Sequence, residues 1–227
     1  MILGNMKKYI SESNKKNKEY SLYGFVPVII KDNFVKEINL RHVLSLVEKK
    51  IPEKLCLNLD VIYIGNFEEF SEREVNAFFR NGALFLTNDQ DDEEDLLDDI
   101  IHEIAHSNEA PYSFIIYGDQ KLQQEFLDKR EKIEEILNSK NIDTSIVDFS
   151  YIEYSQEFDM FLYQDIGYER LSPLIPELFV NPYSITSIRE YYATGFEYYY
   201  LKDLLKLKEI CPILYNKIKI IDSLEEE

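Results

Sequence analysis

Residues 102–106 place two histidines and a glutamate at a spacing that can support hydrolysis on a metal ion. The sequence there is His102-Glu103-Ile104-Ala105-His106, which is the pattern HExxH. Residues four apart lie on one face of a helix, so both imidazoles can reach one Zn²⁺. Glu103 then lies beside the metal, where its carboxylate can take a proton from a water molecule. The motif therefore predicts a zinc hydrolase site; the alternative is a buried helix with two hydrogen-bonded core histidines.

The residues around the motif predict an amphipathic helix. Apolar residues recur in pairs with helical spacing, at Leu96, Leu97, Ile100, Ile101, Ile104 and Ala105. This spacing gives the helix one broad apolar face, with His102 and His106 at its edge. Acidic and capping residues at positions 87–95 favour a helix start there. We therefore expect both histidines to be half sheltered, as a metal site requires.

A catalytic zinc ion usually has three protein ligands and a water. The third histidine, His42, falls on an expected helix of the first lobe and is predicted to be an ordinary, partly buried residue. A carboxylate is therefore expected as the third ligand, and the candidates are Glu109, Asp128, Glu153, Glu157, Asp159, Glu190 and Glu197. Glu190 is favoured because the small residues Ala193 and Gly195 would let its helix pack closely on the motif helix. The alternative is that Glu190 only completes a capping box with Ser187.

The order of predicted elements indicates an α+β fold. Before the motif, the apolar patterns predict strands at 23–30, 55–64 and 83–87, and helices at 34–50 and from Ser71 to Asn81-Gly82. After it they predict helices at 120–140, 156–164, 172–180, 184–202 and 212–222. We predict a zincin-like arrangement: a small N-terminal mixed β-sheet lobe with helices, the HExxH helix at the cleft, and an all-helical C-terminal lobe. Residues 82–87 are expected to edge the cleft and bind an extended peptide, or simply to form the third strand.

Length and composition indicate one folded domain. The chain has 227 residues, of which 45% are hydrophobic, enough for a sizeable core. We expect residues 1–227 to form a single zincin-like metallopeptidase domain. Within it, residues 1–20 are expected to be a flexible arm, 21–110 an α/β lobe with the active-site helix, and 111–227 a helical lobe.

Charge and hydropathy exclude several classes of partner. The formal net charge of −18 argues against nucleic acid, which binds clustered Lys and Arg. No apolar run is long enough for a membrane span. No signal-peptide pattern is visible, so we expect a cytoplasmic protein, although secretion by another route stays open. Cys56 and Cys211 are expected to be buried and reduced.

The residues from Glu190 onward resemble a known metallopeptidase helix. Glu190-Tyr191-Tyr192-Ala193, followed by residues 196–201, is similar to the E-[FY]-[FY]-A-x-x-F helix of the anthrax lethal factor family, which includes the secreted Pro-Pro endopeptidases of clostridia. The resemblance covers the motif helix and the last part of the chain. It implies that Glu190 is the third zinc ligand and that Tyr183, seven residues earlier, is a catalytic tyrosine. Where this family commonly has a second glutamate, four residues after the ligand, this chain has a threonine.

These observations together predict a zinc-dependent metalloendopeptidase that hydrolyses a peptide or protein substrate. His102, His106 and Glu190 are expected to bind Zn²⁺, Glu103 to act as general base, and Tyr183 to donate to the oxyanion. Two alternatives stay open: a non-catalytic zincin-like binding or regulatory protein, and a secreted, toxin-like effector protease. Glu103 favours an enzyme, because a purely structural zinc site has no use for it.

Overall fold

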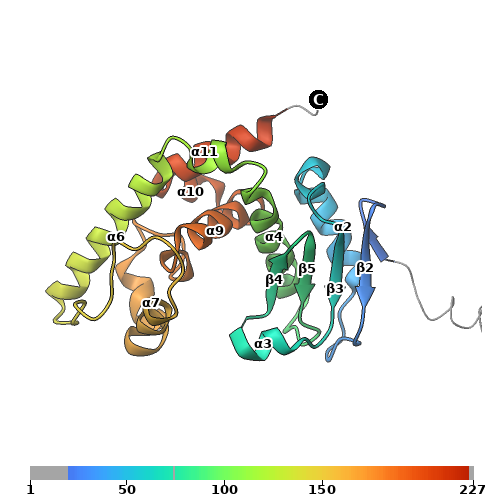
Figure 1. Cartoon of the computed structure of the whole chain (residues 1–227), viewed down its shortest axis with the longest axis horizontal. Helices are drawn as coiled ribbons and strands as arrows, with labels where there is room; N and C mark the ends of the chain where they lie inside the picture. Colours follow the sequence, from blue (N-terminus) through green and yellow to red (C-terminus); the bar gives the residue numbers. More distant parts are fainter. Residues whose placement is uncertain (1–19, 74, 225–227) are drawn as a thin grey trace, which may run out of the picture.

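The computed structural model describes residues 20–73 and 75–224, which form two lobes on either side of one helix (Figure 1). That helix is α4 (Glu93–Glu109); a five-stranded sheet with helix α2 (Leu40–Lys50) lies on one side, and helices lie on the other. The α+β class expected from the sequence is confirmed for these residues. The arm expected at residues 1–20 lies outside the described part of the chain, except for Tyr20, which begins strand β1.

The sheet is mixed, as expected, and has the strand order β1-β2-β3-β5-β4. Its strands are β1 (Tyr20–Leu22), β2 (Val26–Ile30), β3 (Val61–Ile64), β4 (Ala77–Arg80) and β5 (Ala83–Leu86). The central strands β2, β3 and β5 are parallel, whereas β1 and β4 pair antiparallel with their neighbours. The expectation that residues 82–87 edge the cleft is wrong, because β5 is paired on both sides. The edge strand that packs on α4 is β4.

The Asn81-Gly82 pair forms a hairpin turn and does not end a helix. Both residues have positive φ, 51° and 79°, as in the two-residue turns that join antiparallel strands. The helix expected from Ser71 to this pair is therefore wrong: α3 (Glu68–Arg73) ends early, and β4 follows. Across the hairpin Phe78 stacks on Phe85, with ring centroids 4.7 Å apart.

Two other elements of the first lobe are shorter than the apolar pattern suggested. Helix α2 begins after Asn39, whose side chain accepts a hydrogen bond from the His42 N–H, so residues 34–39 lie outside it. The strand expected at 55–64 is reduced to β3, because residues 53–56 form a 3-10 turn, η1 (Glu53–Cys56), that buries Leu55 and Cys56. Apolar residues in a buried turn can alternate as they do in a strand, so periodicity alone could not separate the two.

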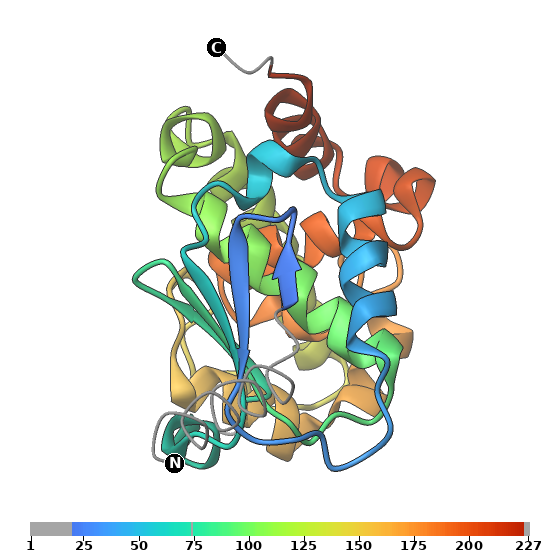
Figure 2. The ribbon, with the colours of Figure 1, turned by 90° about the vertical axis from the view of Figure 1, so that its right-hand side faces the viewer.

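One face of the sheet packs on α2 and α4 and forms the core of the first lobe (Figure 2). The fully buried side chains of this core come from alternate strand positions and from one face of α4: Ile62, Ile64, Leu84, Leu86, Leu96, Ile100 and Ile104. Burying each such side chain stabilises the fold by about 1.5–3 kcal/mol. The motif helix is thus fixed firmly to the sheet.

After α4, every regular element of the described chain is helical. These elements are α5 (Ser113–Tyr117), α6 (Lys121–Ser139), α7 (Gln156–Met160), η2 (Phe161–Ile166), α8 (Tyr168–Leu171), η3 (Ser172–Leu174), η4 (Tyr183–Ile185), α9 (Ile188–Tyr200), α10 (Leu204–Ile210) and α11 (Pro212–Ser223). The helix expected at 172–180 is wrong, since only η3 forms there; Pro176 cannot supply a helical N–H. Over residues 20–73 and 75–224, no helix is long and apolar enough to cross a membrane.

Helix α9 packs along α4 and joins the two lobes. Gly195, which was expected to let α9 pack closely on α4, has its nearest neighbour on α11: a Cβ there would lie 2.3 Å from Leu214 Cδ2. The other core residues of α9 are fully buried, namely Tyr191, Tyr192, Ala193, Thr194 and Phe196. This helix is therefore the centre of the second lobe.

The two cysteines are free and buried, as expected. Cys56 lies in the first lobe and Cys211 at the start of α11 in the second. Burial raises the pKa of Cys56 to about 12, so its thiol stays protonated and unreactive at neutral pH.

Candidate metal centre

Helix α4 presents the HExxH motif at the junction of the lobes. Its start is fixed by Asp92, whose carboxylate accepts hydrogen bonds from the N–H groups of Glu94 and Asp95 at 2.8 and 3.0 Å. A side-chain cap and an acidic first turn both stabilise a helix N-terminus. With one face of α4 buried in the first lobe, the two histidines meet side chains of α9 on the other side.

His102, His106 and Glu190 come together at one point, although Glu190 lies on α9. The Nε2 atoms of the two histidines are 3.2 Å apart. Glu190 Oε2 lies 2.9 Å from His102 Nε2 and 3.5 Å from His106 Nε2. The sequence offered seven carboxylates as a possible third ligand. Among residues 20–73 and 75–224, Glu190 is the one whose carboxylate forms a possible metal-binding group with both histidines.

The three donor atoms fit a zinc ion. Tetrahedral zinc with bonds of 2.0–2.1 Å has its ligand atoms about 3.3 Å apart. The three edges of the donor triangle, 2.9, 3.2 and 3.5 Å, lie around this value. Two imidazole nitrogens and one carboxylate oxygen also form a donor set that suits Zn²⁺ and leaves one position open.

Glu190 satisfies part of the alternative interpretation as well. Ser187 caps α9, because its hydroxyl accepts a hydrogen bond from the Glu190 N–H at 3.1 Å. The Glu190 carboxylate, however, lies against the two imidazoles. The backbone of Glu190 therefore takes part in the cap, while its side chain is available to a metal.

The second nitrogen of each histidine is held by a glutamate. His102 Nδ1 lies 2.5 Å from Glu197 Oε1, and His106 Nδ1 lies 2.6 Å from Glu109 Oε1. These contacts orient the rings so that both Nε2 atoms face the centre, an arrangement typical of histidines that bind zinc. The sequence offered Glu109 and Glu197 only as possible ligands. The spacing of Glu109, three residues after His106 on one helix face, was the available signal.

Glu109 is itself fixed by two further side chains. Arg189 Nε donates to both carboxylate oxygens of Glu109 at 3.0 and 3.1 Å, and the Tyr117 hydroxyl donates to Glu109 Oε2 at 2.8 Å. Glu197 is less closely held, with Lys202 Nζ 3.9 Å away. Arg189 directly precedes Glu190, so this network also ties the end of α4 to the start of α9.

The carboxylates strongly perturb the protonation of the metal-free site. Burial acts to lower the pKa of His106, but hydrogen bonds to Glu109 and Glu190 outweigh it and raise the pKa to about 9. His102 shows the same balance, and its pKa lies well above the ordinary value because of Glu190 and Glu197. Burial acts to raise the pKa of Glu190, yet hydrogen bonds from both histidines keep this pKa below its ordinary value. A metal ion binding here must displace protons from the histidines.

Glu103 lies beside this centre and is only 6% exposed. Burial raises the pKa of its carboxyl group, while the two histidines and the Phe79 N–H of β4, which donates to it, act in the opposite direction. A carboxylate with a raised pKa is a better proton acceptor near neutral pH. The environment of Glu103 therefore favours proton uptake more than that of an exposed glutamate.

Tyr183 lies in η4, next to the imidazole of His102. The two ring centroids are 6.1 Å apart. Burial is the main cause that raises the pKa of the Tyr183 phenol, followed by the negative charge of Glu190. Its hydroxyl therefore stays protonated at neutral pH and can donate a hydrogen bond.

His42 lies apart from this centre. It is exposed on α2, not partly buried as expected, and its Nδ1 contacts Glu93 Oε2 at 2.7 Å. The contact between His42 and Glu93 could not be predicted from the sequence, because the two residues are far apart in the chain. His42 therefore does not belong to the centre, as expected. Its role differs from the expected one, because it makes a contact with Glu93 at the surface and does not pack in the core.

No family model matches this chain, and no curated protein or solved structure matches it either.

Proposed function

We propose that this protein is a zinc-dependent endopeptidase with a zincin-like architecture. The observation that carries the proposal is the donor triangle of His102, His106 and Glu190, with the buried carboxylate of Glu103 beside it. A site that only stabilised the fold would gain nothing from a buried carboxylate placed next to the metal position. Zinc bound to the triangle would lower the pKa of a water molecule and polarise the scissile carbonyl.

Glu103 carries the proton transfers in this mechanism. Its carboxylate takes a proton from the attacking water and passes it to the amine that leaves. The raised pKa of Glu103 suits both steps, since the group must accept the proton and then release it. Because the side chain is buried, it is held in place for the reaction.

Tyr183 is the candidate donor to the oxygen that becomes negatively charged. Its protonated hydroxyl belongs to a ring beside His102, on the second-lobe side of the centre. A donor that is already in place when the charge develops stabilises the transition state more than the substrate. Loss of this hydroxyl is therefore expected to affect kcat more than KM.

Strand β4 is the candidate binding edge for an extended peptide. It pairs with β5 on one side, and its Phe79 N–H reaches Glu103. An exposed strand edge binds a peptide through backbone hydrogen bonds, which places a peptide bond beside the general base. This edge replaces residues 82–87, which the sequence had indicated for that role.

Two measurements on one preparation test the proposal. Zinc analysis is expected to give about one ion per chain, and the zinc-loaded protein is expected to cleave a peptide library or casein, whereas chelator-treated protein is not. Readdition of zinc should restore cleavage. One zinc per chain without cleavage of any peptide would contradict an endopeptidase and favour a binding or regulatory protein.

A further inference from the structure

Arg130 of α6 is fully buried, yet its guanidinium contacts backbone carbonyls and not a carboxylate. Its Nε and Nη2 donate to Ile185 O at 2.9 and 2.7 Å, and Nη2 also donates to Thr186 O at 2.9 Å. On the other side, Nη1 donates to Tyr151 O at 2.5 Å and to Phe149 O at 3.4 Å. Among the described residues, no acidic side chain forms a salt bridge with it.

The guanidinium lies close to two aromatic rings. Its central carbon lies 4.1 Å from the ring centroid of Phe158 and 4.7 Å from that of Phe126. Burial lowers the pKa of Arg130 to about 9, so the group remains charged at neutral pH. A buried charge is costly unless hydrogen bonds compensate it fully.

Two of the carbonyls that Arg130 binds, those of Ile185 and Thr186, belong to the segment that connects Tyr183 with Glu190. Thr186 folds back on Tyr183, since its N–H and its hydroxyl both donate to Tyr183 O, at 3.0 and 2.8 Å. The carbonyls at the end of a short helical turn lack partners within the turn, and a cation there is favourable. Arg130 therefore closes the C-terminal end of η4.

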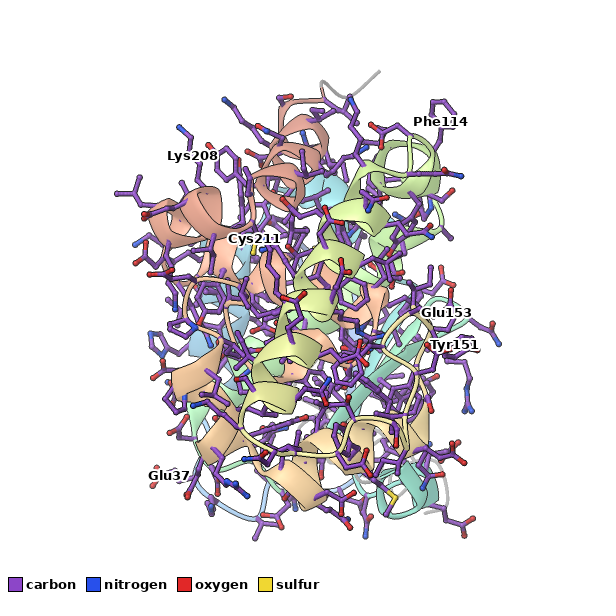
Figure 3. All side chains as sticks on the ribbon, turned by 90° about the vertical axis from the view of Figure 1, so that its left-hand side faces the viewer. Glu37, Phe114, Tyr151, Glu153, Lys208 and Cys211 are labelled. Carbon is purple, nitrogen blue, oxygen red and sulfur yellow. The ribbon has the colours of Figure 1, made fainter. Side chains whose placement is uncertain are left out.

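The loop on the other side of Arg130 supports the same segment. This loop connects α6 to α7 and carries Tyr151 (Figure 3). One residue further along, Ile152 O accepts a hydrogen bond from the N–H of Ile188, the first residue of α9, at 2.9 Å. Arg130 thus links the loop, η4 and the start of α9 at a single point.

We infer that Arg130 is a positioning residue: by holding the carbonyls of Ile185 and Thr186, its guanidinium sets the position of Tyr183 beside the metal centre. The expected effect of Arg130 on kcat rests on the proposed function, whereas its effect on the position of the Tyr183 ring does not. The rival interpretation is that Arg130 only stabilises the second lobe.

A double-mutant cycle separates the two interpretations. Arg130→Lys keeps the charge but loses the planar fork that reaches several carbonyls at once. We expect it to lower kcat about tenfold with little change in KM when Tyr183 is present. In a Tyr183→Phe background, the same substitution should lower kcat less than about twofold, because the hydroxyl that it positions is already gone. Equal effects in both backgrounds would overturn the inference.

Lys129, the neighbouring residue on α6, provides a matched control. It is also buried, and its Nζ donates to the carbonyls of Leu178 and Ile210 at 2.6 and 2.5 Å, away from η4. Lys129→Met should lower the melting temperature, as Arg130→Lys does, but leave kcat of the folded protein unchanged. A fall in kcat equal to that of Arg130→Lys would show that stability alone is responsible.

A second readout does not depend on hydrolysis. In protein with ¹³C-labelled tyrosine rings, the Tyr183 resonance is assigned by its loss in Tyr183→Phe. Arg130→Lys should shift or broaden this resonance, and Lys129→Met should leave it in place. An unchanged Tyr183 resonance in Arg130→Lys would overturn the inference even if no peptide were cleaved. Absence of cleavage by the wild-type protein would count against the endopeptidase alone.

Discussion

At His102 and His106, the two nitrogens of each imidazole have separate partners. The Nδ1 atoms lie against Glu197 and Glu109, and the Nε2 atoms face Glu190 and each other. A carboxylate at Nδ1 fixes the orientation of the ring and raises the basicity of the nitrogen that binds the metal. The affinity of the centre for zinc should therefore depend on glutamates that do not touch the ion.

Glu109→Gln and Glu197→Gln are each expected to weaken zinc binding by about ten- to a hundredfold without abolishing it. Glutamine keeps the size of the side chain but loses the charge that stabilises the ring proton. Competition with a chelator of known affinity measures the change. Glu157→Gln, at an exposed site on α7, removes the same charge and should have no effect. If it weakens zinc binding equally, the effect comes from net charge.

Glu190 and Tyr183 lie on one segment, but substitutions at the two positions should have different effects on zinc binding and activity. Glu190→Ala removes a donor atom of the triangle, so zinc affinity should fall by orders of magnitude and activity with it. Tyr183→Phe removes only a hydroxyl, so zinc content and folding should persist while kcat falls about ten- to a thousandfold. Zinc analysis and steady-state kinetics on both variants decide this. Wild-type zinc affinity in Glu190→Ala would assign the third ligand to another residue.

Residues that act through local spacing could be predicted from the sequence. His102 and His106 lie four residues apart on one helix, so their common face follows from helical geometry, with Glu103 beside it. The role of Glu197 could not be derived in this way, because its contact with His102 needs α9 to pack along α4. Arg130 gave no signal at all, since its partners are backbone carbonyls.

At the scale of elements, the long helices were predicted best. Long amphipathic stretches such as α4 and α6 have a clear period, and α4 also has a capping residue, Asp92. The strands have only a few residues each, and their patterns are easily confused with turns, as at η1. An Asn-Gly pair such as Asn81-Gly82 can end a helix or join two strands. Here it joins two strands, because β4 and β5 pair on either side of it.

The contact between α9 and α11 can be tested at Gly195. Alanine favours a helix by about 1 kcal/mol over glycine, but its Cβ would lie 2.3 Å from Leu214 Cδ2. Overpacking of a buried contact costs about 1–3 kcal/mol. Gly195→Ala should therefore lower the melting temperature, measured by circular dichroism. In a Leu214→Ala background, which removes the clashing atoms, the same change should be neutral or stabilising; destabilisation in both backgrounds would contradict this packing.

At the scale of the whole molecule, the candidate ligands come from both lobes. His102 and His106 lie on the helix fixed to the sheet, and Glu190 lies on the central helix of the second lobe. Zinc bound here would connect the lobes and stabilise the folded chain by mass action. The two-lobed plan followed from the order of predicted elements.

The metal-free protein should lose stability as pH rises above neutrality. The folded pKa of His106, about 9, exceeds its ordinary value of 6.5, so the folded state binds this proton more tightly than the unfolded state. The resulting stability is fully present below pH 6.5 and is lost as pH rises through 9. Thermal unfolding of chelator-treated protein should show a falling melting temperature across this range. Zinc-saturated protein should show a smaller fall, because the metal replaces the proton. The same pH dependence in both forms would contradict the placement of His106 at the metal.

The most direct test of the central claim compares wild-type protein with Glu103→Gln. Both should bind about one zinc ion per chain, because Glu103 does not belong to the donor triangle. The rate of peptide hydrolysis should differ by several orders of magnitude, because the amide cannot accept a proton from the attacking water. Zinc content and hydrolysis are measured on the same samples with the same peptide. Equal zinc content with nearly complete loss of cleavage is the predicted result. Cleavage by Glu103→Gln within a few fold of wild type would show that Glu103 is not the base and contradict the proposed mechanism.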